Sequence, residues 1–344
     1  MKPSLYNFDD EELKQRMLAE KMPAFRARQV LDWIYQKRVE DFGAMKNLPK
    51  EQQELLAEKY SIATLERVER LTSSNGESLK YLFRAADGQL LESVLILQKD
   101  RATVCVSTQI GCKIGCAFCA SGKGKFVRDL SPGEIVEQVL AIERAESRRA
   151  TNIVFMGMGE PLDNFEATMK ALKIFQAPWG LAMGSRRITV STSGITPKIV
   201  EFVERNEGRV RLSVSLHATR DELRTRLVPV NKRYPLDQLL RTLHDIRGRL
   251  KRDITFEYTL IHGVNDSKAD AEELVRIAKG LGTNINLIPC NPIEGETYGP
   301  PDEAAIAAFR KVLYERGVRS LLRQTAGRDI TAACGQLRLR RKTE

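Results

Sequence analysis

"NIVFMGMGEPLDNFEATMKALKIFQ", residues 152–176, contains the unit from which the fold is predicted. Residues 152–158 are typical of a strand, and residues 164–176 place apolar side chains at helical spacing. The strand is apolar on both faces, as strands buried inside a parallel sheet are. The stretch therefore indicates a βα unit of an α/β protein.

The same order of strand and then helix recurs from about residue 102 onward. Repeated βαβ crossovers of this kind give either an open doubly wound sheet or an incomplete TIM-like barrel. In both architectures the chemistry is expected at the carboxyl ends of the strands. The six predicted strands cover residues 102–109, 152–158, 186–193, 210–218, 253–261 and 284–291, and each is followed by at least one helix.

The N-terminal part has a different pattern. Val30, Leu31 and Ile34 share one helical face, while Arg26, Arg28, Lys37 and Arg38 are expected on the exterior. This unit is interpreted either as an RNA-docking module or as a packing cap, and the pattern does not decide between them. The predicted division is a helical domain at 1–62, a β-hairpin connector at 63–97 that turns at Asp87-Gly88, a core at 98–300, and a C-terminal helix, strand and loop at 301–344.

Charge and composition restrict the partners and the compartment. The 344 residues carry a formal net charge of +10, which favours a polyanion because cations placed on phosphates release counterions. A merely basic protein remains the alternative, and the tail "LRLRRKTE" at 337–344 adds a basic cluster. The sequence has neither an apolar signal segment nor an apolar run of membrane-spanning length, so a cytoplasmic protein without a membrane partner is predicted.

Three cysteines stand close together in "GCKIGCAFCASG", residues 111–122. Cys112, Cys116 and Cys119 have the spacing C-x3-C-x2-C, without a second pair that would complete a four-ligand zinc site. A [4Fe-4S] cluster normally takes four cysteines. Three would leave one iron open to a substrate or cofactor, and this interpretation is favoured over zinc.

A glycine-rich turn follows the strand at 152–158. Gly157 and Gly159 would let backbone groups approach a ligand, and Glu160 offers a carboxylate to an ammonium group. Such a turn is a weak signal on its own, since similar glycine spacings occur in many loops.

Taken together, these motifs resemble the radical SAM superfamily. The resemblance rests on the cysteine spacing, the aromatic Phe118 before the third cysteine, and the position of the motif in the first loop of a βα array. It implies that S-adenosylmethionine chelates the open iron and that one electron cleaves it to a 5′-deoxyadenosyl radical. Residues 157–161 are similar to the superfamily motif that holds the methionine amino group.

The match is closer to one family, the RlmN/Cfr rRNA adenosine methyltransferases, and most like the RlmN branch. It extends over essentially the whole chain and implies an α/β fold, an incomplete TIM-like (β/α)6 radical SAM barrel. Two departures, Ser121 where threonine is common and Lys125 after a glycine, touch no ligand position. The motifs, in family order, are "ATVCVSTQIGC", "CAFCASGKGKF", "GMGEPLDN", "VSTSGI", "SVSLHA", "LIPCNP" and "GRDITAACGQL".

The resemblance assigns three catalytic residues. Cys334 matches the cysteine that takes a methyl group from one S-adenosylmethionine, after which the radical made from a second abstracts hydrogen from that methyl. The methylene radical adds to adenine, and Cys105 matches the cysteine that forms a disulfide with Cys334 on release. Glu92 matches the proton acceptor of that step. The plainer interpretations are a buried core role for each cysteine and a solvent-facing Glu92.

The resemblance also implies the residues that hold the cofactors. Strand-end serines and asparagines are also routine caps, and Ser213 is an alternative to Ser215 as the cofactor contact. Cys290 is predicted to be a core residue. The implied set is Cys112, Cys116 and Cys119 for the cluster, and Gly159, Glu160, Ser191, Ser215, Leu216, His217 and Asn291 for S-adenosylmethionine.

The predicted function is therefore methylation of adenosine C2 in 23S rRNA, with tRNA as an open second substrate. Methylation at C8, a radical SAM enzyme acting on a small molecule, and an RNA-binding module without turnover remain as alternatives. We also expect a monomer and an electron donor such as flavodoxin or ferredoxin.

Overall fold

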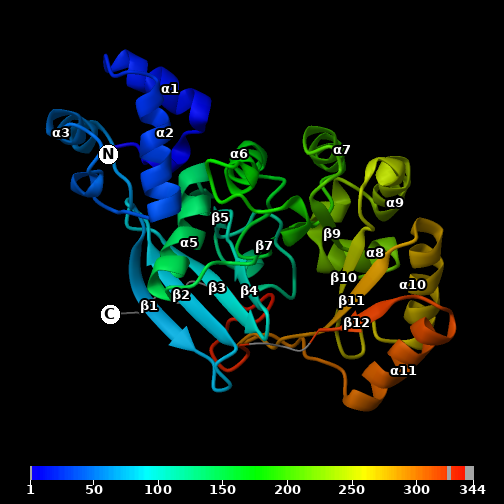
Figure 1. Ribbon diagram of the computed structural model, residues 1–344. Coiled ribbons are helices and arrows are strands. Elements are labelled where there is room, and N and C mark those ends of the chain that lie inside the picture. The colour runs from blue at the N-terminus through cyan, green and yellow to red at the C-terminus, as the bar shows by residue number, and fades with distance from the viewer. Residues whose placement is uncertain (1, 324–326, 338–344) are drawn as a thin grey trace.

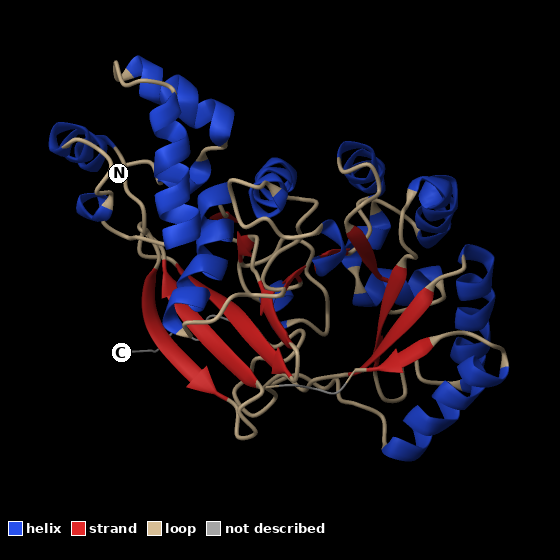
Figure 2. Ribbon diagram, viewed as in Figure 1, coloured by secondary structure: helices blue, strands red, loops and turns tan. Residues whose placement is uncertain are grey.

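The computed structural model of the chain describes residues 2–323 and 327–337. Its centre is a ten-stranded mixed sheet with the strand order β1-β2-β3-β4-β7-β8-β9-β10-β11-β12 (Figure 1). The sheet curves, and helices cover its outer face (Figure 2). The predicted α/β class and incomplete barrel are confirmed.

Seven neighbouring strands of this sheet run parallel, and crossover helices connect them. The first six with their helices are the predicted βα units, and the seventh strand closes the series at the edge. The strands are β4 (Arg101–Cys105), β7 (Asn152–Phe155), β8 (Ile188–Thr192), β9 (Arg211–Ser215), β10 (Thr255–Leu260), β11 (Asn284–Pro289) and β12 (Ser320–Leu322). The helices are α5 (Pro132–Ala145), α6 (Phe165–Gln176), α7 (Thr196–Arg205), α8 (Asp221–Leu227), α9 (Leu236–Ile246), α10 (Lys268–Leu281) and α11 (Glu303–Glu315).

The hairpin predicted before the core forms the antiparallel edge of the same sheet. β2 (Ser78–Arg84) and β3 (Leu90–Gln98) pair with each other, and β3 pairs in turn with β4. A further strand, β1 (Glu66–Thr72), pairs with β2 at the outer edge and was not predicted. The sheet is therefore continuous from the edge strand into the parallel core.

Short elements complete the loop that follows β4. β5 (Gln109–Ile110) and β6 (Arg128–Asp129) form a small separate ladder, with α4 (Ala120–Lys123) between them. Helix α5 then follows, and side chains cap its first turn. The Ser131 side chain accepts from the Glu134 amide, and the Glu134 side chain accepts from the Ser131 amide, which together form a capping box.

The N-terminal helices form a separate layer beside α5 and the sheet (Figure 1). Val30, Leu31 and Ile34 are fully buried, as their shared helical face predicts. The helices are α1 (Asp10–Ala19), α2 (Phe25–Leu31), which continues as a π-helix over Asp32–Lys37, and α3 (Lys50–Lys59); short 3-10 turns occur at Leu5–Asn7, Phe42–Ala44, Ser185–Arg187, Pro229–Lys232 and Arg247–Arg249.

Buried polar contacts fix this layer to the core. The Glu137 carboxylate of α5 accepts hydrogen bonds from the Thr64 amide and hydroxyl, both at 2.6 Å, and from the Leu65 amide at 2.9 Å. Arg38 forms an ion pair with Glu143, which is also on α5. The expectation that Arg38 lies on the exterior is therefore wrong, because its side chain is only 11% exposed and holds the two layers together.

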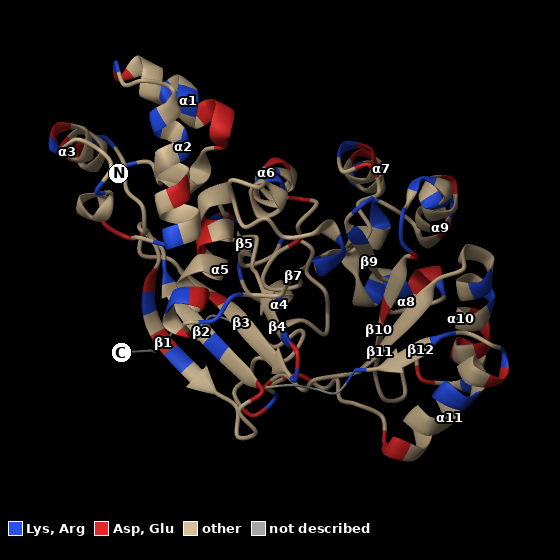
Figure 3. Cartoon of the chain, viewed as in Figure 1, with Lys and Arg blue, Asp and Glu red and all other residues tan. Residues whose placement is uncertain are grey.

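Charged side chains of both signs alternate over the outer helices, whereas the central strands carry few (Figure 3). Among the residues that the structure describes, none of the helices combines the length and hydropathy needed to cross a bilayer.

Candidate active site

A cavity of about 150 Å³ opens at the carboxyl ends of the parallel strands, where the architecture predicts the chemistry. Its walls come from the cysteine loop, from the ends of β7 to β11 and from the C-terminal loop. Ten of the predicted site residues line it: Cys112, Cys116, Cys119, Gly159, Glu160, Ser191, Ser215, His217, Asn291 and Cys334.

The three cysteines of the first motif lie in the loop between β5 and α4 and are held in low-polarity surroundings. Burial raises the pKa of Cys112 to about 12 and raises the pKa of Cys119; for Cys116 burial raises it well above its ordinary value, and the charges of the other two thiols add to that effect. The three groups therefore interact, and each would need a cation to hold it as a thiolate.

This arrangement fits an iron–sulfur cluster better than a single ion. Among the described residues, no three Cys, His, Asp or Glu side chains come close enough to share one metal ion. A four-iron cluster binds each cysteine through a different iron, so its cysteines stand farther apart than the ligands of one ion. The three thiols of the cysteine loop match a cluster with one open iron, whereas Cys334, which also lines the cavity, comes from the C-terminal loop.

Glu160 is fixed at the edge of this cavity by several donors. Its carboxylate accepts from the Ser193 amide at 2.7 Å, the Ser193 hydroxyl at 2.8 Å and the Leu162 amide at 3.0 Å. Burial raises the pKa of Glu160, and these hydrogen bonds oppose the rise. A buried, oriented carboxylate of this kind is suited to receive an ammonium group.

The turn before Glu160 requires glycine. Gly159 has φ of +99°, and a Cβ there would lie 2.5 Å from Cβ of Gln109. Both the backbone angle and the close approach exclude a side chain. The backbone of this turn is thereby held close to the cysteine loop.

His217 presents one defined tautomer to the cavity. Its Nδ1 accepts a hydrogen bond from the Thr259 amide at 3.0 Å, which leaves the proton on Nε2. Burial, aided by the Arg224 charge, lowers the pKa of His217 to about 3, so the ring is neutral at physiological pH. The Phe118 ring packs edge-on against it with centroids 4.7 Å apart, which links the cysteine loop to the end of β9.

The two serines of β9 have different surroundings. Ser215 lines the cavity, whereas the Ser213 hydroxyl donates to Glu257 at 2.6 Å and lies outside it. Leu216 is fully buried in the apolar core and does not line the cavity. Of the two serines, Ser215 is thus the one placed to meet a ligand there, while a role for Leu216 in cofactor binding stays a prediction.

Arg224, which the sequence did not single out, holds these strand ends in place. The fully buried guanidinium donates to the carbonyls of Ser193 at 2.6 Å and Ser215 at 3.0 Å. It also donates to the Asn231 side chain at 2.7 Å. A buried arginine with several acceptors fixes the ends of β8 and β9 relative to each other.

Cys334 is exposed and reaches the cavity from the C-terminal loop. The Asn291 side chain donates to the Cys334 carbonyl at 3.0 Å, and the Ala120 amide donates to the Gly335 carbonyl at 2.7 Å. The Ser121 hydroxyl donates to the Leu337 carbonyl at 2.7 Å. The loop is thus held directly over the cysteine motif, although more than 200 residues separate the two in sequence.

Cys105, at the end of β4, packs beneath the same loop. It belongs to a small apolar cluster with Ala332 and Leu337, which flank Cys334. Burial raises the pKa of Cys105 to about 12, and the charge of Cys334 contributes to the rise. The structure therefore brings the two cysteines together, one buried and one exposed, and all six cysteines of the chain are free thiols.

Arg323 lies between this pair and the barrel interior. The charge that Cys334 would carry raises the pKa of Arg323, as do the charges of Glu257 and Cys105. Its guanidinium is 3.7 Å from the Glu257 carboxylate and 3.7 Å from the Met156 sulfur. Sequence reasoning missed it, because a single arginine in a basic chain gives no signal.

Glu92 does not line the cavity but is buried beside it, which excludes the solvent-facing interpretation. It forms an ion pair with Lys80 of β2 at 3.1 Å. Lys80 also donates to the Thr331 hydroxyl at 2.9 Å, on the loop that carries Cys334. A lysine in the alternating pattern of β2 gave no reason to expect this buried bridge.

The comparisons with known proteins agree with this geometry. Residues 106–276 match the radical SAM superfamily, and residues 4–62 match the ribosomal RNA large subunit methyltransferase N-terminal domain. The chain is 44% identical over 346 residues to the probable dual-specificity RNA methyltransferase RlmN of Geobacillus kaustophilus, covering 99% of this chain and 94% of that protein. The chain belongs to the RlmN family.

Two further similarities support the assignment to this family. The dual-specificity RNA methyltransferase RlmN of Nitratiruptor is 44% identical, with 94% of this chain and 96% of that protein covered. A crystal structure of a radical SAM methyltransferase from Sphaerobacter thermophilus superposes with a TM-score of 0.94 at 45% identity, covering 98% of this chain and 99% of the other. Membership of the radical SAM superfamily implies a [4Fe-4S] cluster and S-adenosylmethionine as cofactors.

Proposed function

We propose that this protein is a radical SAM methyltransferase that adds a methyl group to C2 of adenosine in 23S rRNA, with tRNA as a second substrate. The names of the full-length relatives support an RNA substrate and dual specificity. The observation that carries the proposal is the gathering of the three-cysteine loop, Glu160 and the Cys105–Cys334 pair around one site. A protein that only binds RNA has no use for the Cys105–Cys334 pair.

In this proposal Cys112, Cys116 and Cys119 would hold the cluster, and the cavity walls would hold S-adenosylmethionine. The carboxylate of Glu160 is oriented to accept the methionine ammonium group. Nε2–H of His217, together with Ser191, Ser215 and Asn291, supplies polar groups for the rest of the molecule. When bound, the cluster and S-adenosylmethionine supply a carbon radical that can abstract a hydrogen atom.

Exposure distinguishes the roles of the two other cysteines. The thiolate is the nucleophile in methyl transfer; Cys334 is exposed to an incoming methyl donor, whereas Cys105 is buried and burial raises its pKa to about 12. Cys334 therefore takes the methyl group, and its sulfur gains a bond to carbon as its proton leaves. The Arg323 guanidinium lies close enough for the charge of Cys334 to raise its pKa.

Release of the methylated base needs the buried partner. Cys105 attacks the Cys334 sulfur, an S–S bond forms, and the sulfur–carbon bond to the product breaks. The two sulfurs together lose two electrons and the Cys105 thiol loses its proton; the electron pair of the broken sulfur–carbon bond stays on the transferred carbon, which takes up a proton and becomes the methyl group. Glu92, held by Lys80, is the proposed acceptor of the proton that leaves the base. The disulfide must then be reduced before the next turnover.

Nucleoside mass spectrometry tests this function. Anaerobically reconstituted enzyme, reductant and S-adenosylmethionine are incubated with unmodified 23S rRNA or tRNA, with C2- and C8-methyladenosine standards. C2-methyladenosine in both RNAs is the expected result. C8-methyladenosine would contradict the C2 assignment, and cleaved cofactor without methyladenosine would overturn the proposed substrate. A flavodoxin or ferredoxin as the electron donor, a monomer, and RNA docking by residues 1–62 stay predictions.

A further inference from the structure

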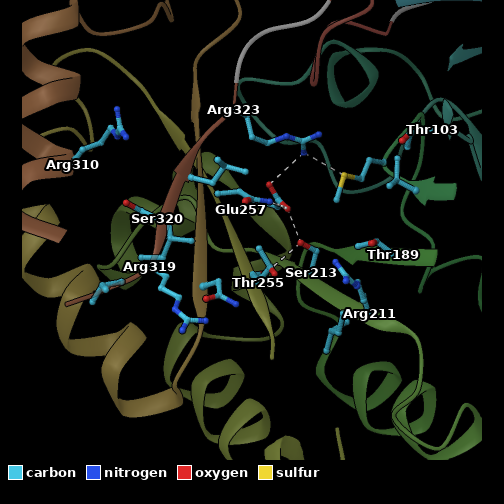
Figure 4. A pocket seen from close by; sticks show the side chains of 18 of the residues that line it. Thr103, Thr189, Arg211, Ser213, Thr255, Glu257, Arg310, Arg319, Ser320 and Arg323 are labelled. Carbon is cyan, nitrogen blue, oxygen red and sulfur yellow. Dashed lines mark hydrogen bonds and ion pairs between the residues drawn. The ribbon is translucent and has the colours of Figure 1, made fainter. Parts of the chain in front are cut away.

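A second and larger cavity, of about 1110 Å³, opens at the amino ends of the parallel strands (Figure 4). Small-molecule sites commonly enclose about 300 to 1,000 Å³, so this space admits a ligand larger than one nucleotide. Met156, Glu257 and Arg323 line both this cavity and the active-site cavity. The two spaces therefore adjoin inside the barrel, with these three side chains between them.

The inner face of the barrel carries polar side chains among apolar ones, whereas the interior of such folds is usually apolar. In TIM barrels, branched apolar side chains fill the interior in layers. Every second residue of a strand points into the barrel. On β8, Thr189 lines the larger cavity and Ser191 the smaller one, and on β9 the same holds for Ser213 and Ser215. At the amino ends the lining residues include Arg101, Asn152, Arg211, Asn284 and Ser320. This interior suits a hydrated, polar ligand and not a packed core.

Its charge is strongly positive and largely uncompensated. The side chains of Arg101, Arg211, Arg310 and Arg319 are exposed, and none has an acidic or hydrogen-bond partner among the described residues. The carboxylate that lines this cavity, Glu257, already has partners within the protein. It accepts from Ser213 at 2.6 Å and from Asn286 at 2.9 Å, and it lies 3.7 Å from Arg323. Free guanidinium groups around one cavity attract a polyanion.

An exposed aromatic ring stands beside these cations. Tyr314 on α11 lines the cavity, is 83% exposed and lies one helical turn from Arg310. Exposed tyrosines next to basic groups are the platforms on which single-stranded nucleic acids stack their bases. A simple inorganic anion would need the arginines but would have no use for the ring.

We infer that this cavity binds the single-stranded stretch of the RNA substrate that flanks the target nucleotide. The inference rests on the proposed function, because it assigns a place to that function's substrate. Enzymes that modify a base take it out of the stack, which splays the neighbouring nucleotides. The target base enters the site cavity, while neighbouring phosphates lie against Arg310 and Arg319 and a neighbouring base stacks on Tyr314.

RNA binding by single variants tests this placement. The probe is a fluorescent RNA hairpin that carries the target adenosine, unmodified, in its loop. It is titrated with cluster-loaded enzyme at several salt concentrations. Arg319→Glu is expected to lower the slope of log Kd against log salt by about 1, as the loss of one phosphate contact does. Tyr314→Ala is expected to raise Kd about five-fold or more without changing that slope.

The control is Lys279→Glu on the outer helix α10, which makes the same change of charge at an exposed side chain that has no partner within residues 2–323 and 327–337. It is expected to leave Kd within two-fold of the unaltered enzyme. Equal effects of Arg319→Glu and Lys279→Glu would mean that only net charge matters, and would overturn the inference. So would wild-type binding by both cavity variants.

Cross-linking locates the RNA directly. Hairpins with 4-thiouridine on either side of the target adenosine are irradiated in the complex, and the linked peptides are identified by mass spectrometry. Peptides from residues 303–323 are expected, whereas cross-links confined to residues 4–62 would contradict the placement. Cross-linking needs no turnover, so the cross-links would persist even if the proposed methylation failed. Normal methylation without these cross-links would overturn this inference and leave the proposed function intact.

Discussion

The two ends of the parallel strands differ in how their polar groups are satisfied. At the carboxyl end, Glu160, His217 and Arg224 are buried, and each has defined partners. At the amino end, exposed arginines such as Arg211 and Arg319 have no protein partner among the described residues. Preorganised groups suit chemistry on a small cofactor, whereas unpaired cations suit a long polyanion. The contrast predicts that substitutions at the carboxyl end abolish cluster binding or chemistry, whereas substitutions at the amino end weaken RNA binding.

The largest effect is expected for Cys116→Ala. Removing one of three ligands leaves a buried site that cannot hold the cluster, so the variant should lose its iron and all turnover. Iron analysis and the visible absorption spectrum measure this, with Arg319→Ala at the other end as the control that retains iron. Full iron content in Cys116→Ala would remove the cluster assignment and, with it, the contrast between the two ends.

The next effect separates the two cysteines of the proposed mechanism. Cys334→Ala should retain iron and cofactor cleavage but form no methylated RNA, because the methyl acceptor is gone. Cys105→Ala should accumulate a covalent RNA–protein adduct, because the thiol that resolves it is missing. Denaturing gel electrophoresis of labelled RNA detects the adduct. Free methylated RNA from either variant at the wild-type rate would refute the two-thiol mechanism.

A smaller effect is expected at the buried bridge beside the site. Lys80→Met removes the cation that is paired with the buried Glu92, a change that costs up to about 3 to 5 kcal/mol in the free energy of unfolding. Urea unfolding measures it, and the double variant Lys80→Met with Glu92→Gln should recover part of the loss because the buried negative charge is removed. A loss below about 0.5 kcal/mol would show that the bridge does not hold the Cys334 loop in place.

Much of this arrangement could be predicted from local patterns. Strand-then-helix periodicity identified the six βα units, which the structure shows in the predicted order. The cysteine spacing and the strand-end motifs identified most of the residues that line the site cavity. These features succeed because hydrogen bonding within a turn and alternation along a strand depend on residues close together in sequence.

Long-range contacts account for what the sequence left out. Lys80 meets Glu92 across neighbouring strands and meets Thr331 from a segment 251 residues away. Arg38 was expected in solvent but pairs with Glu143 of another layer. No periodicity records such pairs, because their partners are set by how the layers dock. No local sequence pattern marks the arginines at the amino ends of the strands either, because only the sheet topology brings them around one cavity.

The most modest effect follows from the neutral ring of His217. An unfolded histidine has a pKa of about 6.5, whereas the folded value is about 3. Between these values the unfolded chain binds a proton that the folded chain does not, so stability falls as pH decreases through this range. From pH 7.5 to 5.5 this contributes a loss of about 1.4 kcal/mol in the free energy of unfolding.

His217→Asn, which tolerates the positive φ of 56° and does not titrate, should lack that part of the pH dependence. Urea unfolding of both proteins at the two pH values measures the difference, and identical pH dependence would mean that the ring is not held neutral. The exposed His244 of α9 provides the matched control, because His244→Asn makes the same substitution away from the site cavity.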